Sequence, residues 1–375
     1  NVGSLERKSM IRKINRVFQN FLRNQKIKIA RLLWDKKEKL KIIKENLIEK
    51  NGIDSIIIMR DDGKIGDMVV SSFIYREIKK QYPNIKIGVV TRKGATDIIK
   101  DNHYVDKIYE YKKDSSYLKN LANEIAKEKY DLLIDTSTIL REKQIMFINK
   151  CDCKINLGVD KEGWQLFDIS VPEEKNSHIT KRFINILEVL GIKEIQSNYD
   201  IQISDEAIKS VKEKILEEEG IINPNEKKRV ILNPYTASKH RNFNRKNIEK
   251  IIETLLKYRE NEIYLLGHGE NKKEILEIKE KIKDKRVHYI ELAGIQEVIA
   301  LIKNCEMIIS PDTSIVHIGV GLDKKVIAVY REDIIGNNSI LWGPNSDKAI
   351  QIFSKENKDD DINNFDMREI ERTVS

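Results

Sequence analysis

The sequence is poor in cysteine and contains no long uninterrupted apolar segment. Three cysteines in 375 residues, Cys151, Cys153 and Cys305, give no disulfide framework, so we expect a protein of a reducing, cytoplasmic compartment. Cys151-Asp152-Cys153 lacks a second pair of ligands, and we therefore expect no metal site. No segment reaches the roughly 18 apolar residues of a membrane-spanning helix. We also expect no signal peptide, because its ordered pattern of charge, apolar run and cleavage site does not occur.

The net charge of +8 is concentrated in one part of the chain. Residues 1–50 carry a net charge of +10, which leaves −2 for the remaining residues. A nearly neutral body is not typical of a protein that coats nucleic acid, so we expect no nucleic-acid partner.

Residues 10–34 have the pattern of a basic amphipathic helix. Apolar and aromatic residues, among them Phe18, Phe21 and Trp34, alternate with lysines and arginines at helical spacing. Such a helix suits an anionic bilayer surface, where the aromatic rings would lie at the headgroup boundary. The alternative is a helix that packs on its own domain or on a second subunit.

After Asn51-Gly52, apolar strands alternate with helices, and the alternation starts again near residue 229. Continuous apolar runs separated by helices are typical of a parallel sheet that is covered on both faces. The sequence therefore predicts an α/β protein with two doubly wound, Rossmann-like domains that face each other across a cleft. The expected strands are 55–59, 86–90, 131–135, 229–232, 262–266, 307–310 and 326–329, and the expected helices are 68–81, 205–219, 247–258 and 296–303.

The first constellation of polar residues follows the first expected strand, from Arg60 to Asp67. Gly63 and Gly66 permit a tight turn, and ligands of open α/β sheets bind at the carboxyl ends of strands. Asp67 is thus a candidate site residue, although it could simply cap the following helix. The segment has no G-x-G-x-x-G fingerprint, which disfavours a dinucleotide oxidoreductase.

A second constellation, Ser310 to His317, follows a strand of the second domain and opens a helix. A helix N-terminus offers free N–H groups to a phosphate, and Thr313 and Ser314 add hydroxyl groups. The alternative is a capping Asp312 or Thr313 with His317 packed against the sheet.

Two further segments follow strands of the second domain. In the first, cationic side chains could neutralise a diphosphate and hydroxyl groups could donate hydrogen bonds, but an ordinary basic surface loop would look the same. In the second, a carboxylate could bind a ribose or simply be solvated. The candidate residues are Thr236, Ser238, Lys239, Arg241 and Glu270.

These motifs, in this order, resemble glycosyltransferase family 9, the ADP-heptose:lipopolysaccharide heptosyltransferases. Gly66-Asp67 resembles the family's early Gly-Asp turn, and the segment from Asp312 to His317 resembles its Asp-Thr-Gly-x-x-His motif. Residues 233–243 resemble its Asn-Pro-Gly-Ala…Lys-x-Trp loop. Lesser similarities are Tyr82-Pro83, residues 130–135, residues 154–159 and Trp342-Gly343-Pro344.

The resemblance implies the GT-B architecture and an inverting, metal-independent transfer of a sugar, expected to be heptose. The donor would be a nucleotide-diphosphate sugar such as ADP-heptose, and the acceptor a lipopolysaccharide core glycolipid. Asp67 matches the catalytic base. The expected donor-binding residues are Thr236, Ser238, Lys239, Arg241, Glu270, Asp312, Thr313, Ser314 and His317. No cofactor is expected, because the nucleotide sugar is a substrate.

Two departures from the family pattern concern the donor. Ser314 stands where the family usually has glycine, and Arg241-Asn242-Phe243 stands where Lys-x-Trp is usual. An arginine holds a diphosphate with a fork rather than a point charge, so the donor geometry could differ. Another nucleotide sugar on another glycan, or a non-catalytic sugar-nucleotide-binding protein, stays open as an alternative.

Acceptor groups carrying carboxylates or phosphates would account for Arg92, Lys93 and Arg141 near strand ends of the first domain. We expect the enzyme at the cytoplasmic face of the inner membrane, held by its N-terminal helix. The expected division of the chain is a helical extension (1–50), an acceptor domain (51–205), a connector (206–228), a donor domain (229–350) and a tail (351–375).

Overall fold

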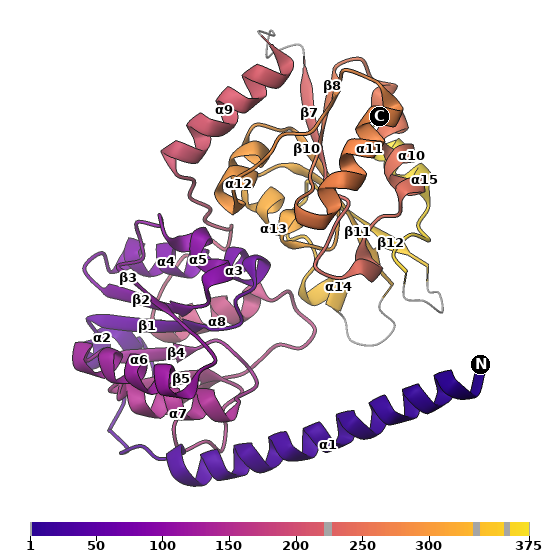
Figure 1. The fold of residues 1–375 in the computed structure, drawn as a ribbon. Helices are drawn as coiled ribbons and strands as arrows, with labels where there is room; N and C mark the ends of the chain where they lie inside the picture. Colours follow the sequence, from indigo (N-terminus) through magenta and orange to yellow (C-terminus); the bar gives the residue numbers. More distant parts are fainter. Residues whose placement is uncertain (1, 221–226, 333–337, 356–360, 375) are drawn as a thin grey trace.

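A computed structural model describes residues 2–220, 227–332, 338–355 and 361–374 (Figure 1). For residues 2–14, 239 and 338, only the backbone is described. The described chain forms two α/β domains, each built on a six-stranded parallel sheet. The predicted α/β class with two Rossmann-like domains is therefore confirmed.

The N-terminal sheet has the strand order β3-β2-β1-β4-β5-β6. Its order reverses between β1 and β4, and such a switch point is where open α/β sheets bind ligands. The strands are β1 (Ser55–Arg60), β2 (Lys86–Thr91), β3 (Lys107–Glu110), β4 (Leu132–Asp135), β5 (Ile155–Val159) and β6 (Ile169–Val171). The helices are α2 (Leu47–Asn51), α3 (Ile65–Ser71), α4 (Phe73–Gln81), α5 (Lys93–Ile99), α6 (Ser115–Glu128), α7 (Glu142–Cys151) and α8 (Thr180–Leu190).

The C-terminal sheet repeats this topology with the order β12-β11-β10-β7-β8-β9, so its switch point lies between β7 and β10. The strands are β7 (Lys228–Leu232), β8 (Asn261–Leu265), β9 (Val287–His288), β10 (Met307–Pro311), β11 (Lys325–Arg331) and β12 (Ala349–Ser354). The helices are α10 (Arg245–Leu256), α11 (Lys272–Ile282), α12 (Ile295–Lys303), α13 (Ser314–Gly321), α14 (Asn338–Leu341) and α15 (Met367–Val374), with short 3-10 turns at Lys239–Arg241 and Gly269–Asn271.

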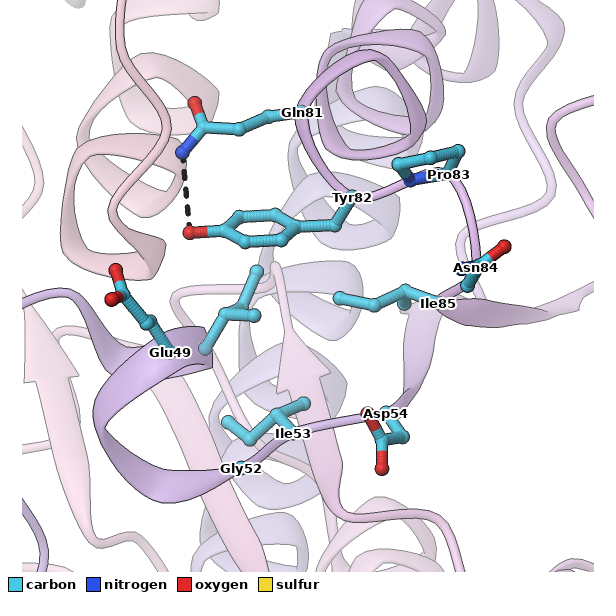
Figure 2. A pocket seen from close by; sticks show the side chains of 10 residues that line it. Glu49, Gly52, Ile53, Asp54, Gln81, Tyr82, Pro83, Asn84 and Ile85 are labelled. Atoms are coloured by element: carbon cyan, nitrogen blue, oxygen red, sulfur yellow. Dashed lines mark hydrogen bonds between the residues drawn. The ribbon is translucent and has the colours of Figure 1, made fainter.

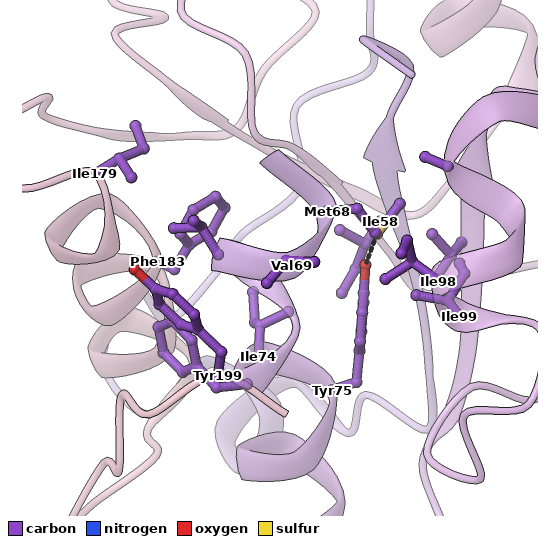
Figure 3. Close-up of a cluster of buried hydrophobic side chains, with 14 of the residues drawn as sticks. Ile58, Met68, Val69, Ile74, Tyr75, Ile98, Ile99, Ile179, Phe183 and Tyr199 are labelled. Carbon is purple, nitrogen blue, oxygen red and sulfur yellow. Dashed lines mark hydrogen bonds between the residues drawn. The ribbon is translucent and has the colours of Figure 1, made fainter. Parts of the chain in front are cut away.

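One hydrophobic core runs through the junction of the two domains. It joins apolar residues of α3, α4, α5 and α8 to those of α12, α13 and the linking helix α9 (Asp205–Glu219). Figure 3 shows the N-terminal part, where Phe183 of α8 meets Val69 and Tyr75 packs beside Met68. Two further clusters cover the outer faces of the sheets, under α6 and α7 and under α10, α11 and α15. The inner helices are therefore fixed from both sides, and they carry the candidate site.

The structure differs from the expected boundaries in three places. The expected helix 68–81 is divided at Ser72, whose hydroxyl donates to the Val69 carbonyl at 2.6 Å. The expected domain boundary at residue 50 falls inside α2, whose Leu47 is fully buried. The boundary at residue 350 falls inside β12, and Ile370 of α15 is buried in the C-terminal domain. Described residues of the expected tail thus contribute to that domain's core, while residues 356–360 and the terminal Ser375 lie outside the described residues.

The N-terminal helix α1 (Val2–Trp34) packs on the body near its C-terminal end (Figure 1). Ile27, Ala30 and Trp34 contact the cluster beneath α6 and α7, and Arg31 lies 4.5 Å from the centre of the Trp164 ring. Trp34 was expected at a lipid headgroup boundary, but it is half-buried against protein because it faces α7. No helix among the described residues is long and apolar enough to cross a bilayer.

Candidate active site

Asp67 lies in the first turn of α3, directly after the switch-point strand β1. Gly63 has a φ of +71°, and an added Cβ there would lie 2.8 Å from the Arg92 Cβ, so the turn requires glycine. The Asp62 carboxylate accepts from the Lys64 N–H at 3.0 Å and closes the turn. Lys64 occupies the cap position and Asp67 comes three residues later. The alternative that Asp67 caps the helix is therefore wrong.

Asp67 is a largely buried carboxyl group with cations around it. Burial is the main cause that raises the pKa of Asp67 above its ordinary value, and the charge of Asp62 adds to it. Arg60, Lys64 and Arg182 oppose that rise, and the Lys64 Nζ lies 4.0 Å from Oδ2. A carboxylate with a raised pKa is a stronger base, and the N-terminus of α3 still favours its negative charge.

The facing element is the N-terminus of α13 in the other domain. The Thr313 side chain caps this helix by accepting from the Ile315 N–H at 3.2 Å. The Asn233 amide, from the end of β7, donates to Ser310 Oγ at 2.9 Å and to Thr313 Oγ1 at 3.3 Å. The two strands at the C-terminal switch point are thus tied together where α13 begins, and Ser314 opens the helix.

His317 is a buried, uncharged imidazole between the domains. Its ring makes edge contacts with Tyr199 and Trp342, each with centroids 6.4 Å apart, rather than packing flat on the sheet. Burial is the main cause that lowers the pKa of His317 to about 4, and the charge of His178 adds to it. Within the described chain, its Nδ1 has no hydrogen-bond partner. His317 can therefore position a ligand or a neighbouring helix, but near neutral pH it carries no charge for a diphosphate.

Helices α3 and α13 meet at Gly66. A Cβ added there would lie 3.2 Å from His317 Cδ2 and 3.5 Å from the Ser314 Cα. This close approach places Asp67, the next residue, beside the start of α13. The fold thus brings together two predicted site segments that are about 245 residues apart in the sequence.

The loop after β7 places Arg241 against the same helix start. Its Nη1 lies 3.0 Å from Asp312 Oδ2. The Thr236 hydroxyl instead donates to the Ser238 carbonyl at 2.7 Å, which occupies its hydrogen within the loop. Ser238 is exposed, and the Lys239 side chain lies outside the described part of the structure. Arg241 is therefore a cation of this loop whose described side chain contacts Asp312, just before the start of α13.

The remaining candidates lie on segments other than α3 and α13. Glu270 is exposed after β8, Lys93 is exposed at the start of α5, and Arg141 is exposed before α7. The Arg92 guanidinium lies 5.6 Å from the centre of the Tyr111 ring, and its Nε is buried without a hydrogen-bond partner among the described atoms.

Sequence reasoning included Arg60 in the first constellation without giving it a role and missed Arg182; the two meet at Thr136. Arg60 Nη1 donates to Thr136 Oγ1 at 3.1 Å, and Arg182 Nη1 donates to the Thr136 carbonyl at 3.0 Å. Arg60 could have been noticed as a charge that ends an otherwise apolar strand, whereas Arg182 has no comparable signal in α8.

Two other features do not extend this site. In the described parts of the chain, no group of three or more His, Cys, Asp or Glu residues could hold a metal ion. The pocket in Figure 2 includes Asp54 and Ile85, which precede β1 and β2. It therefore lies at the amino ends of these strands, away from Asp67. Tyr82 and Pro83, matched above to a family motif, line this pocket.

Comparisons with known proteins agree with this architecture. The family model described as glycosyltransferase family 9 (heptosyltransferase) matches residues 118–369. An Escherichia coli K12 protein with the provisional name lipopolysaccharide heptosyltransferase 4 is 25% identical over 325 residues, which cover 83% of this chain and 85% of that protein.

Solved structures of similar fold include glycosyltransferases. A family 9 glycosyltransferase of Veillonella parvula has a TM-score of 0.68 at 18% identity and covers 85% of this chain and 90% of its own. Escherichia coli heptosyltransferase WaaC with ADP has a TM-score of 0.64 at 14% identity and covers 85% and 96%.

The two facing Rossmann-like domains define a GT-B protein. The match over most of the chain identifies its family: the chain belongs to glycosyltransferase family 9 and is a glycosyltransferase of the heptosyltransferase type. The matched range begins after Asp67, so the role of that residue stays a prediction.

Proposed function

We propose that this protein transfers a heptose, with inversion, from a nucleotide-diphosphate donor such as ADP-heptose to a lipopolysaccharide core-type acceptor. The observation that carries the proposal is the contact of α3 with α13 at Gly66, which brings the segment that holds Asp67 to the start of α13 at Ser314. The names of the relatives support the substrate class, since one is a lipopolysaccharide heptosyltransferase and another was solved with ADP.

In the proposed reaction, Asp67 takes the proton of an acceptor hydroxyl. The hydroxyl oxygen attacks the anomeric carbon of the donor from the face opposite the leaving group, and the bond from that carbon to the diphosphate oxygen breaks. Arg241, Lys239 and the N–H groups at the start of α13 stabilise the charge that develops on the nucleotide diphosphate. These groups take the electrostatic role that a metal ion would otherwise have.

Asp67→Asn tests this assignment. The variant keeps the shape of the side chain but cannot accept the proton, so turnover should fall about 10²–10⁴-fold. Calorimetric binding of ADP should stay within twofold of wild type, because the proposed donor site lies in the other domain. Turnover within threefold of wild type would remove Asp67 from the mechanism.

A panel of nucleotide sugars tests the donor. If ADP-heptose gives no transfer but a UDP- or GDP-sugar does, the chain is a GT-B enzyme for a different glycan. If several sugar nucleotides bind and none is turned over, the chain is a sugar-nucleotide-binding protein without activity.

The proposal places the enzyme on the cytoplasmic face of an anionic membrane through α1. Among the described side chains of α1, seven large apolar ones are exposed: Val17, Phe18, Phe21, Leu22, Ile29, Leu32 and Leu33. At about 100° per residue, all seven fall within an arc of about 160°. Ile27, Ala30 and Trp34, which pack on the body, lie on the opposite side. The apolar side thus faces away from the protein, as an interfacial helix requires.

Basic residues strengthen this interpretation of α1. Arg16, Arg23 and Lys26 lie outside the apolar arc, and each cation near an anionic surface contributes about 1 kcal/mol. Phe18→Asp/Phe21→Asp should therefore lose co-sedimentation with anionic vesicles. Gln19→Asp/Asn20→Asp is the matched control, because it adds the same charge at exposed positions outside the arc. Equal vesicle binding by the two variants would contradict membrane docking. If the control variant forms dimers and the Phe18→Asp/Phe21→Asp variant does not, the apolar side of α1 is a subunit interface.

A further inference from the structure

Arg60 is a buried guanidinium whose hydrogen-bonding capacity is only partly used. It ends β1 and is 4% exposed, with its Cζ 5.3 Å from the centre of the Phe183 ring. Nη1 donates to Thr136 Oγ1, but Nε and Nη2 make no hydrogen bond among the described atoms, although Nη2 forms an ion pair with Asp62. The nearest carboxylate oxygen, on Asp62, lies 3.5 Å from Nη2. Leaving such donors unpaired in the interior is costly, so a ligand that supplies acceptors would be favoured.

In the neighbouring Arg182, by contrast, each of the three guanidinium nitrogens donates a hydrogen bond. Its Nε and Nη2 donate to the two Glu173 oxygens at 2.6 and 2.7 Å, and its Nη1 donates to the Thr136 carbonyl. Both guanidinium groups are thus anchored on Thr136. Arg182 has a bidentate carboxylate of its own, whereas the Nε–Nη2 edge of Arg60 has none.

The Nε–Nη2 edge of Arg60 faces the turn that leads to the candidate base. Asp62, the carboxylate nearest to this edge, begins the turn that ends at α3. Arg60 also points to the same face of the sheet as Ile56 and Ile58, because side chains alternate along β1. That face is covered by α3 and α8, and α3 carries Asp67 in its first turn. The Arg60 charge is among those that act on Asp67.

We propose that the Nε–Nη2 edge of Arg60 binds an anionic group of the sugar acceptor, a carboxylate or a phosphate ester, and thereby holds the neighbouring hydroxyl at Asp67. Carboxylate and phosphate both offer two oxygens at the spacing of a guanidinium fork. Asp62, whose side chain is 35% exposed, can turn toward solvent when the acceptor group takes its place. This subsite rests on the proposed function, and it assigns Arg60 to acceptor recognition rather than to the donor.

The test compares Arg60→Met and Arg60→Lys with wild type and with Arg245→Met, a control that removes an exposed arginine of the other domain. The probes are a heptose-free lipopolysaccharide extract, the same extract after removal of phosphate esters, and the extract after reduction of its carboxylates. Binding of the delipidated oligosaccharides is measured by calorimetry, and KM and kcat are measured with the intact extracts.

Arg60→Met should raise the acceptor KM and Kd at least 10-fold, with ADP affinity unchanged. Arg60→Lys should recover only part of the loss, because an ammonium lacks the fork. The chemical treatment that removes the recognised group should lower the acceptor affinity of wild type to that of Arg60→Met and leave the affinity of the variant unchanged. The treatment that has this effect shows whether the recognised group is a phosphate or a carboxylate. The unfolding midpoint of Arg60→Met should equal or exceed that of wild type, because the variant removes unpaired buried donors. Arg245→Met should bind as wild type does.

An acceptor affinity within twofold of wild type in Arg60→Met would overturn the subsite, as would an equal loss with all three probes. If wild type binds the oligosaccharide in an Arg60-dependent way but transfers no sugar from any donor, the proposed reaction fails and the subsite stands. If wild type neither binds nor transfers, both proposals fail.

Discussion

Substitution of Gly66 should separate the candidate base from the donor helix without unfolding the protein. The Cβ of Gly66→Ala would lie 3.2 Å from His317 Cδ2, a few tenths of an ångström inside the usual carbon–carbon contact of about 3.5–4.0 Å. The ring of His317 cannot easily retreat, because it lies between Tyr199 and Trp342. The alanine should therefore be accommodated by a small shift of α3 against α13.

Gly66→Val adds two methyl groups, each about 1.5 Å beyond the Cβ. The second nearest neighbour is the Ser314 backbone, which cannot rotate out of the way. The helices should then move apart by roughly 1 Å, and a misplacement of that size can cost about 100-fold in rate. We expect kcat to fall a few-fold in Gly66→Ala and about 100-fold in Gly66→Val.

The assay measures release of nucleotide diphosphate, with ADP binding and the unfolding midpoint in parallel. ADP affinity should stay within twofold, and Gly66→Ala should not destabilise α3, because alanine is the better helix former. Gly294→Ala and Gly294→Val are the controls, since Gly294 has extended backbone and no atom within 4 Å of an added Cβ. A Gly66→Val enzyme with turnover within threefold of wild type would refute the role of this contact.

Three further outcomes are expected. Arg241→Ala should weaken ADP binding by about 1.5–3 kcal/mol, roughly 10–100-fold, as the loss of a charged hydrogen-bond donor does; unchanged affinity would place the diphosphate elsewhere. Dialysis against excess EDTA should leave turnover intact, and a complete loss restored by Mg²⁺ would contradict a metal-independent reaction. Burial is the main cause that raises the pKa of Asp61 from 3.8 to about 6, and the charge of Asp135 adds to it. Above pH 6 the ionised Asp61 therefore destabilises the folded state, and this destabilisation disappears as the pH falls toward 4. Asp61→Asn should therefore increase the free energy of unfolding at pH 8 by up to roughly 3 kcal/mol and give little gain at pH 4, as urea titrations at both values would measure.

The sequence predicted part of the helices and strands, and it missed others, among them the amphipathic helices α6 and α8. The helix expected at 205–219 is α9, and the strands expected at 55–59 and 307–310 are β1 and β10 within one residue. β5 and β12 were missed although they have five and six residues, and β3, β6 and β9 were missed because strands of two to four residues give too little alternation to detect. Their places in the sheets come from pairing with β2, β5 and β8, which a linear pattern does not contain.

The sequence could predict those parts of the candidate site whose residues lie close together in the chain. Asp67 and the segment from Asp312 to His317 stand at strand ends, where chain order alone suggests a ligand site. Arg60 and Arg182 are 122 residues apart and meet at Thr136 only because α8 packs over the switch point of the first sheet. The uncharged state of His317 likewise depends on burial by Tyr199 and Trp342, which come from distant segments.

The burial of His317 decides which groups can act on the donor. A histidine with a pKa of about 4 supplies no cation at neutral pH, so the proposed reaction assigns the charge of the diphosphate to Arg241, Lys239 and the start of α13. The same burial fixes the imidazole against Gly66 and leaves its Nδ1 without a hydrogen-bond partner within the described structure. Because this ring holds the start of α13 against α3, the proposed donor groups and the proposed base keep their separation only while the domains stay packed. The GT-B junction thus positions the proposed chemistry as directly as the side chains do.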